Sequence, residues 1–260
     1  MTTTPYALVT GASQGLGKYF ARALAARGQN VVLVARTAAK LEALAAELRD
    51  AHNVLAEPVV CDLAAPEAGL GLAGELRGRE IAVELLVNNA GFGLRGEFLS
   101  LTLERQMEMI RLHDSAAVEL TYELLPAMIE RGRGGFINVS SMAGFQPIPY
   151  AALYSATKAF LTTFSMALRE ELRLSGCGVR VVTLCPGRLR ADPEEAEDVR
   201  RSKVPGGEQG HEEVVAEALK KFEEGGGLVI PGRVNRWMLA GQRLIPPNAV
   251  PKIVAKKSKP

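Results

Sequence analysis

Residues 6–17 read YALVTGASQGLG, and this stretch decides the fold. A short apolar strand runs directly into a glycine-rich turn, and a helical pattern follows to residue 26. Glycines let a backbone approach a pyrophosphate, and a helix start supplies N–H groups and a positive dipole end. The spacing is G-x-x-x-G-x-G, not the commoner G-x-G-x-x-G, and glycine turns of this kind also occur without a ligand. The residues predicted to bind phosphate groups here are Gly11, Ser13, Gln14, Gly15, Leu16 and Gly17.

Strand and helix patterns alternate along almost the whole chain, without an internal repeat or a linker. This predicts an α/β fold in one domain over residues 1–260: a doubly wound, Rossmann-type parallel sheet of about seven strands with helices on both faces. The predicted strands cover residues 6–10, 30–35, 54–61, 83–87, 135–140, 179–185 and 228–231. The main helices are predicted at 64–79, 103–131, 151–175 and 211–223.

Composition narrows the class of protein. A length of 260 residues, 47% hydrophobic and 23% charged, suits one globular α/β domain. The formal charge of +2 and the scattered aromatic residues argue against a nucleic-acid partner. Three cysteines indicate reduced thiols, and the chain runs into its first strand without room for a signal peptide. No apolar run approaches the ~18 residues of a spanning helix, so we expect a cytoplasmic protein without membrane insertion, and we predict no metal site.

Arg36 indicates the cofactor. It stands at the end of the second predicted strand, where the usual fingerprint has a carboxylate that binds the ribose of NAD. No acid is present there, Ala35 leaves space, and a guanidinium suits a 2′-phosphate. The alternative is a solvated arginine that opens the next helix. The cofactor is therefore predicted to be NADP(H).

Residues 141–158 carry a predicted proton-transfer site. Tyr154 and Lys158 are four residues apart on a helix, so they share a face at ~5–6 Å between their Cβ atoms. A neighbouring ammonium favours the phenolate and is expected to lower the pKa of the tyrosine from ~10. Ser141 follows the fifth predicted strand, where its hydroxyl can bond a substrate carbonyl or alkoxide. An ordinary helix face is the alternative for Tyr154 and Lys158 alone.

Further residues stand at the carboxyl ends of predicted strands. Because these ends meet at one edge of a parallel sheet, the residues should converge on the same crevice. The asparagines among residues 88–91 are also placed to tie neighbouring strand ends together. The predicted crevice residues are Asp62, Leu63, Asn89, Ala90, Gly91, Pro186 and Gly187.

Taken together, the motifs resemble the short-chain dehydrogenase/reductase family over residues 5–187. They are Thr-Gly-x-x-x-Gly-x-Gly, Asn-Asn-Ala-Gly, a serine thirteen before the tyrosine, Tyr-x-x-x-Lys and Pro-Gly, in that order. The resemblance implies that Tyr154 is the general acid-base and that Lys158 lowers its pKa and holds the nicotinamide ribose. It implies that Ser141 orients the substrate oxygen and that Asp62 contacts adenine, and it supports Arg36 as a mark of NADP preference.

The sequence departs from the family pattern at two places. The family asparagine thirteen before a Leu-Pro proline, which holds a water in the proton relay, corresponds to His113. An imidazole can also hold a water, so His113 is a candidate catalytic residue; alternatively it only packs. The threonine that usually follows Pro-Gly and bonds the carboxamide is missing, because Arg190, Ala191 and Asp192 occupy that region.

The predicted function is reduction of a small-molecule carbonyl to an alcohol, or the reverse, by hydride transfer from NADPH. The alternatives are an epimerase or dehydratase-type enzyme that uses the same site, and a protein that binds NADP(H) without turnover. A homodimer or homotetramer is expected. The charged residues 188–210 are predicted to form a mobile substrate segment, in which Arg188 and Arg190 either meet an anionic substrate or pair with nearby acids. The lysine-rich C-terminal tail either touches anionic lipid or is simply solvated.

Overall fold

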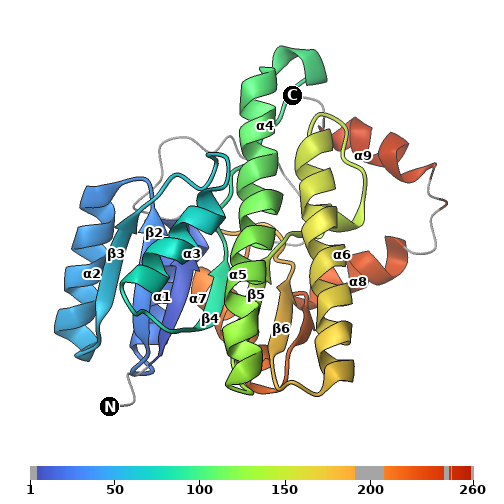
Figure 1. Ribbon diagram of the computed structural model, residues 1–260. Helices are drawn as coiled ribbons and strands as arrows, with labels where there is room; N and C mark the ends of the chain where they lie inside the picture. The colour runs from blue at the N-terminus through green and yellow to red at the C-terminus, as the bar shows by residue number, and fades with distance from the viewer. Residues whose placement is uncertain (1–4, 191–207, 243–245, 247, 259–260) are drawn as a thin grey trace.

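The computed structural model describes residues 5–190, 208–242, 246 and 248–258. Within these residues the chain alternates between strands and helices, as the sequence predicts (Figure 1). The strands are β1 (Tyr6–Thr10), β2 (Asn30–Ala35), β3 (Ala56–Val60), β4 (Val83–Asn88), β5 (Gly135–Val139), β6 (Arg180–Leu184) and β7 (Gly227–Val229).

These strands form one parallel sheet in the order β3-β2-β1-β4-β5-β6-β7. The chain begins in the middle at β1, winds outward to β3, returns to β4 and winds outward again to β7. The direction of winding reverses between β1 and β4, and a doubly wound sheet forms its ligand crevice at that switch point. The predicted fold class is confirmed.

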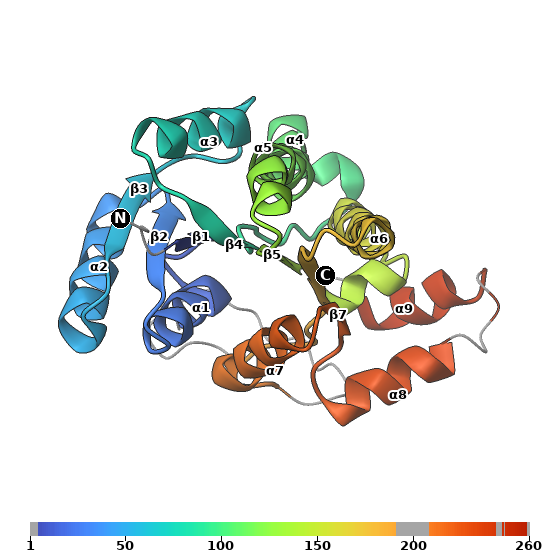
Figure 2. The same cartoon turned by 60° about the horizontal axis from the view of Figure 1, so that its bottom comes forward.

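Helices cover both faces of the sheet (Figure 2). One face carries α1 (Gly15–Ala25), α2 (Ala38–His52) and α7 (His211–Glu223), and the other carries α3 (Ala68–Gly78), α5 (Ala116–Glu130) and α6 (Ala152–Ser175). Each face has its own buried cluster. The first includes Phe20, Leu41 and Leu219, and the second includes Leu72, Leu120 and Leu172. Both faces of the sheet are covered by helices and shielded from water, so the strand sequences are nearly continuous apolar runs.

The predicted helix at residues 103–131 is interrupted. It consists of α4 (Leu103–Ile110), a π turn η2 (Arg111–Ser115) and α5, which follow one another in space (Figure 1). A π turn holds one more residue than an α turn, so it redirects the side chains that it carries, and such turns are frequent at functional sites. His113 and Asp114 both lie on this turn.

Several predicted boundaries were wrong. The third strand is shorter than residues 54–61, and α3 begins at Ala68 and not at residue 64, because Pro66 and the left-handed Glu67 (φ 55°) delay the helix. The seventh strand ends at Val229 and not at residue 231, and the fifth and sixth each end one residue early. The apolar stretch near the C-terminus belongs to α8 (Arg233–Gln242), which α9 (Val250–Ser258) follows.

All three cysteines are free thiols, as expected. Among the described residues, no helix combines the length and the apolar character needed to cross a bilayer. The same part of the chain contains no group of three or more His, Cys, Asp or Glu side chains placed to hold a metal ion. Most of the predicted mobile segment, residues 191–207, lies outside the described residues.

Candidate active site

A cavity of about 550 Å³ opens at the carboxyl ends of the central strands. It extends from the turn after β1, past the ends of β2 and β4, to the start of α6. The sequence-predicted residues that line it are Gly11, Ser13, Gln14, Gly15, Leu16, Arg36, Asp62, Leu63, Asn89, Ala90, Gly91, His113, Ser141, Tyr154, Lys158, Pro186 and Gly187.

The glycine turn brings backbone close to this cavity. Gly11 has a φ of +66°, and a Cβ there would lie 2.9 Å from the Cα of Ala90, so only glycine fits without displacing the neighbouring loop. The helix that follows, α1, is capped by Gln14 without a side-chain hydrogen bond. The first turn of α1 therefore presents N–H groups and its positive dipole end to an anion in the cavity.

Gly17 does not line the cavity, although the sequence places it with the phosphate-binding residues. A Cβ at Gly17 would lie 2.2 Å from the carbonyl oxygen of Gly11 and 2.6 Å from Nδ2 of Asn89. Its role is close packing of α1 against the end of β1.

Buried polar side chains tie the strand ends together, as predicted for the asparagines. The Thr10 hydroxyl accepts hydrogen bonds from the N–H groups of Asn89 (2.9 Å) and Ala90 (3.0 Å). Asn88 Nδ2 donates to Asn138 Oδ1 at 2.8 Å, which joins the ends of β4 and β5. These bonds fix the loop after β4 that forms one wall of the cavity.

Ser141, Tyr154 and Lys158 meet at the far end of the cavity. Ser141 follows β5 in extended conformation (φ −165°), and its hydroxyl caps the next turn by accepting from the N–H of Ala143 at 3.1 Å. Tyr154 and Lys158 lie one turn apart near the start of α6. The Lys158 ammonium donates to the carbonyl oxygen of Val139 at 3.0 Å, so this buried cation is anchored to β5.

The pKa values of this group are set mainly by burial. Burial raises the pKa of the Tyr154 phenol, and a hydrogen bond with Ser141 acts in the opposite direction. The sequence predicts that Lys158 lowers the pKa of Tyr154. The pKa is raised instead, because desolvation of the phenolate outweighs the other influences. Burial also lowers the pKa of Lys158 to about 8. Tyr154 is thus held as a phenol, the form that can give up a proton.

His113 forms hydrogen bonds with both ring nitrogens. Nε2 accepts from the backbone N–H of Phe92 at 3.0 Å, and Nδ1 lies 3.0 Å from the Thr157 hydroxyl. This arrangement fits the neutral tautomer with its proton on Nδ1, and burial lowers the pKa of His113 to about 2. Gly91 gives the ring its space, because a Cβ there would lie 2.7 Å from Nε2. With both nitrogens engaged, the geometry favours packing over the water-holding role.

Removing the His113 ring should therefore cost stability. His113→Ala is expected to lower the free energy of unfolding by about 2–4 kcal/mol, because it leaves a cavity and an unpaired N–H at Phe92. Urea unfolding would measure this, with His52→Ala on the exposed end of α2 as the matched control, where a change within about 0.5 kcal/mol is expected. Equal losses in the two variants would contradict the packing role.

Asp114 is a site residue that the sequence reasoning missed. Its Oδ1 atom is buried and has no hydrogen-bond partner among the described residues. Burial raises the pKa of this carboxyl to about 7, although the positive charge of Lys158 acts to lower it. Burial lowers the pKa of Lys158, and the negative charge of Asp114 is the largest influence that raises it. The only sequence signal was an acid beside His113 at the middle of an otherwise apolar helix face.

The coupling between these two side chains predicts a change in pH dependence. Asp114→Asn removes the charge that supports the ammonium, so the pKa of Lys158 should fall below 8. Activity that needs charged Lys158 should then decline at a lower pH, which the alkaline limb of a kcat/KM profile would show. Asp50→Asn, on the exposed surface of α2, is the control. An unchanged alkaline limb in Asp114→Asn would rule out the coupling.

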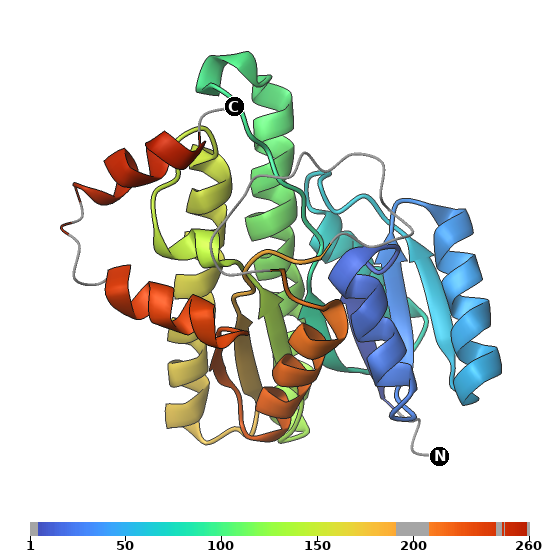
Figure 3. The ribbon, with the colours of Figure 1, turned by 180° about the vertical axis from the view of Figure 1, so that it is seen from behind.

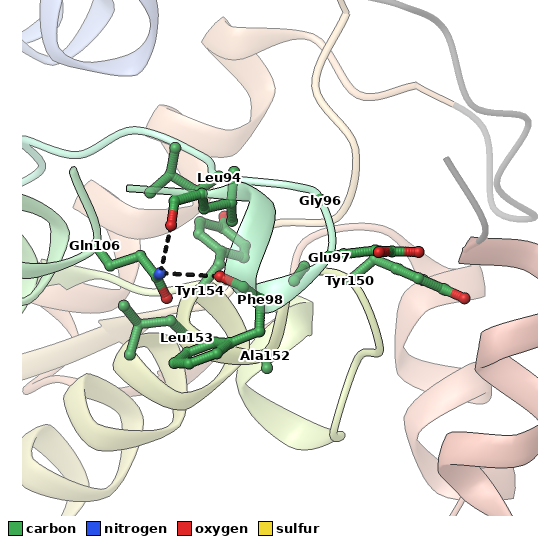
Figure 4. Close-up of a pocket in the computed structure, with 11 residues that line it drawn as sticks. Leu94, Gly96, Glu97, Phe98, Gln106, Tyr150, Ala152, Leu153 and Tyr154 are labelled. Atoms are coloured by element: carbon green, nitrogen blue, oxygen red, sulfur yellow. Dashed lines mark hydrogen bonds between the residues drawn. The ribbon is translucent and has the colours of Figure 1, made fainter. Parts of the chain in front are cut away.

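A second, largely apolar pocket of about 290 Å³ adjoins Tyr154 (Figure 4). One wall is the start of α6, and the other is the segment after β4. Gln106, which is buried, donates to the carbonyl oxygens of Phe98 (3.2 Å) and Leu101 (3.1 Å) and holds this segment in place. Apart from Tyr154, the apolar side chains along the pocket are Leu94, Phe98, Leu101, Ala151, Ala152 and Leu153.

The segment after Gly187 is described only at its two ends. Arg188 Nε lies 3.3 Å from a carboxylate oxygen of Glu208, so this arginine has an acidic partner within the chain. The backbone of Arg190 bonds that of Gln209 at 2.9 Å. Internal pairing of Arg188 is thereby favoured over a role in binding an anionic substrate. The acids that the sequence analysis expected as partners fall in residues 191–207.

Comparison with known proteins identifies the family. A family model described as short chain dehydrogenase matches residues 5–200, which is most of the chain. The chain belongs to the short-chain dehydrogenase/reductase family. The family is one of oxidoreductases, and it uses a nicotinamide cofactor.

Three similar proteins show the range of relatives. The very-long-chain 3-oxoacyl-CoA reductase of Coprinopsis cinerea is 38% identical over 173 residues, which are 66% of this chain but only 51% of that protein. The chain thus spans about half the length of this relative. An uncharacterized oxidoreductase of Myxococcus xanthus is 40% identical over 72% of both chains. A short-chain dehydrogenase from Sphingobium yanoikuyae, solved in complex with NADPH, is 34% identical with a TM-score of 0.78, and the match covers 92% of this chain and 94% of that one.

Proposed function

We propose that the protein is an NADPH-dependent reductase of ketones that carry a large apolar substituent. The observation that carries this proposal is the meeting of Ser141, Tyr154 and Lys158 at one end of a cavity whose other end holds Arg36. The apolar pocket that adjoins Tyr154 supports a substrate with a large apolar group. The very-long-chain 3-oxoacyl-CoA reductases among the relatives, by their name, act on ketones with long apolar chains.

The residues present fit NADP(H). Gly11 lets the turn pack against the backbone of Ala90, and the start of α1 faces the cavity. Asp62 and Arg36 line the same cavity and are the residues that would contact adenine and the 2′-phosphate. The bound cofactor supplies the hydride that reaches the carbonyl carbon. Lys158 is the residue that would hold the nicotinamide ribose.

The protein's own side chains carry the proton. The Ser141 hydroxyl donates a hydrogen bond to the ketone oxygen and orients it toward Tyr154. The Tyr154 phenol gives its proton to that oxygen as negative charge develops there, and the alcohol forms. Charged Lys158 stabilises the phenolate that remains until a proton returns from solvent. Over one turnover a ketone, a hydride and a proton become one alcohol.

The first prediction from this function concerns the cofactor. Arg36→Ala should weaken NADPH binding at least about tenfold, because a charge-assisted hydrogen bond to phosphate contributes about 1.5–3 kcal/mol. NADH lacks the 2′-phosphate, so its affinity serves as the internal control and should hardly change. Fluorescence titration with both cofactors measures this. A wild-type protein that binds NADPH and NADH equally well would contradict the assignment of Arg36 to the 2′-phosphate.

The experiment that tests the function is a substrate series. Ketones of matched reactivity and increasing apolar chain length should be compared with short polar ketones, with NADPH consumption and alcohol formation both measured. We expect kcat/KM to rise with apolar size, and we expect the rise to weaken in Leu153→Ser, which makes the pocket wall polar. Stoichiometric consumption distinguishes this enzyme from an epimerase, which regenerates its cofactor. No turnover with any ketone would favour the binding protein without catalysis.

The expected homodimer or homotetramer remains a prediction. In its support, α6 exposes Phe160 (44%) and Met166 (47%), and Phe160 stacks on Phe164 with ring centroids 6.0 Å apart. An apolar patch on a long surface helix suits a contact between copies.

A further inference from the structure

The helix α8 carries a row of exposed apolar side chains. Trp237 is 75% exposed, Val234 51% and Met238 38%, and their spacing places them together on the outward face. Arg233 and Arg236 lie along one edge of this face, and the Arg236 guanidinium lies 3.7 Å from a carboxylate oxygen of Glu217. Tryptophan, with an apolar ring and a polar N–H group, is the side chain that is most characteristic of a membrane–water boundary.

The opposite face of α8 is fixed to the protein. Asn235 is buried, and its Nδ2 donates to the carbonyl oxygen of Pro231 at 2.8 Å and to Gln209 Oε1 at 3.1 Å. At the other end, Gln242 Nε2 donates to the carbonyl oxygen of Phe145 at 2.7 Å. The helix is therefore held at both ends, with Trp237 directed away from the core. Figures 2 and 3 show α8 and α9 at the periphery of the molecule, at the end far from α2.

Charge is distributed unevenly along the chain. Residues 225–260 contain seven lysines and arginines and no aspartate or glutamate, whereas the whole chain has a formal charge of +2. The preceding 224 residues accordingly carry a formal charge of −5. The segment that carries the exposed tryptophan is thus strongly basic on an otherwise acidic protein, and such a segment is attracted to an anionic surface.

We propose that the outward face of α8 binds the surface of an anionic membrane. The apolar side chains enter the boundary between headgroups and acyl chains, while Arg233 contacts lipid phosphates. This attachment lies on the surface and does not require a helix that crosses the bilayer. A nucleic acid would satisfy the basic charge but offers no apolar layer for Val234 and Met238. A second copy of this chain would satisfy the apolar row but would bring two basic segments together.

Trp237 is the single tryptophan of the chain, so its fluorescence reports on this face alone. The full-length protein is titrated with vesicles of phosphatidylcholine and with vesicles that contain phosphatidylglycerol in equal part. Anionic vesicles should shift the emission to shorter wavelength, and neutral vesicles should bind far more weakly. Raising the salt to about 1 M should reverse most of the binding, because the Debye length falls to about 3 Å.

Two variants locate the contact. Arg233→Glu keeps the fluorescent reporter and should weaken vesicle binding about fivefold or more. Arg77→Glu, on an exposed side chain of α3, is the matched control and should bind as the wild type does. Trp237→Ser, followed by vesicle co-sedimentation, should lose most binding, and thermal unfolding of each variant checks that the fold is retained.

The proposal is overturned if neutral and anionic vesicles bind equally, or if Arg233→Glu and Arg77→Glu behave alike. It is also overturned if Trp237 emits at short wavelength in the protein alone and vesicles leave the emission unchanged, since another copy of the chain then covers this face. None of these readouts depends on ketone turnover, so the membrane contact is tested independently of the proposed function.

Discussion

Replacing Tyr154 by phenylalanine is expected to lower kcat for ketone reduction by about 10²–10⁴-fold. The change removes the transferable proton and leaves the ring, which packs edge-on against His113 with centroids 6.0 Å apart. NADPH affinity should therefore stay close to that of the wild type. Stopped-flow measurement of single-turnover hydride transfer, together with a separate binding titration, would separate the two effects.

Tyr150 provides a matched control for this variant. It lines the same apolar pocket as Tyr154, and Tyr150→Phe removes the same hydroxyl group. Its backbone has a left-handed φ of 64°, which phenylalanine and tyrosine tolerate equally poorly, so the substitution adds no strain. We expect little change in kcat. A large loss in Tyr150→Phe with near-normal rates in Tyr154→Phe would mean that the proton donor is assigned to the wrong residue.

Lys158→Met should reduce kcat/KM by at least about 10²-fold, and it should also weaken NADPH binding. Methionine has a similar length but carries no charge, so both support for the phenolate and contact with the ribose are lost. The double effect separates this variant from Tyr154→Phe, which should spare the cofactor. Lys220→Met, whose side chain is 76% exposed on α7, controls for removal of a lysine. If Lys158→Met bound NADPH normally, the assignment of Lys158 to the ribose would be wrong.

Sequence periodicity was sufficient to predict the sheet and the residues that line the cavity. Parallel strands buried on both faces leave an unmistakable apolar pattern, and the residues that follow them must converge at one edge. The position of Gly17 relative to the cavity could not be predicted from the motif alone. The motif places it with the phosphate-binding glycines, but whether a glycine faces a ligand or a neighbouring carbonyl depends on packing between α1 and the end of β1.

Properties that depend on the environment of a group were not predictable. The pKa of Tyr154 follows its burial, which four-residue spacing from Lys158 does not reveal. The π turn has no sequence signature, and it determines how His113 and Asp114 are directed. Likewise, the pocket beside Tyr154 joins two segments about fifty residues apart, which only the folded chain brings together.

The most direct test of NADPH-dependent ketone reduction follows the hydride itself. The protein is given a reactive apolar ketone and NADPH that carries deuterium at both positions on C4 of the nicotinamide, and the alcohol is analysed by mass spectrometry and NMR. We predict one deuterium on the carbinol carbon, one NADPH consumed for each alcohol formed, and loss of both signals in Tyr154→Phe. Alcohol without deuterium on that carbon would contradict hydride transfer from NADPH, and deuterated alcohol formed equally fast by Tyr154→Phe would contradict Tyr154 as the proton donor.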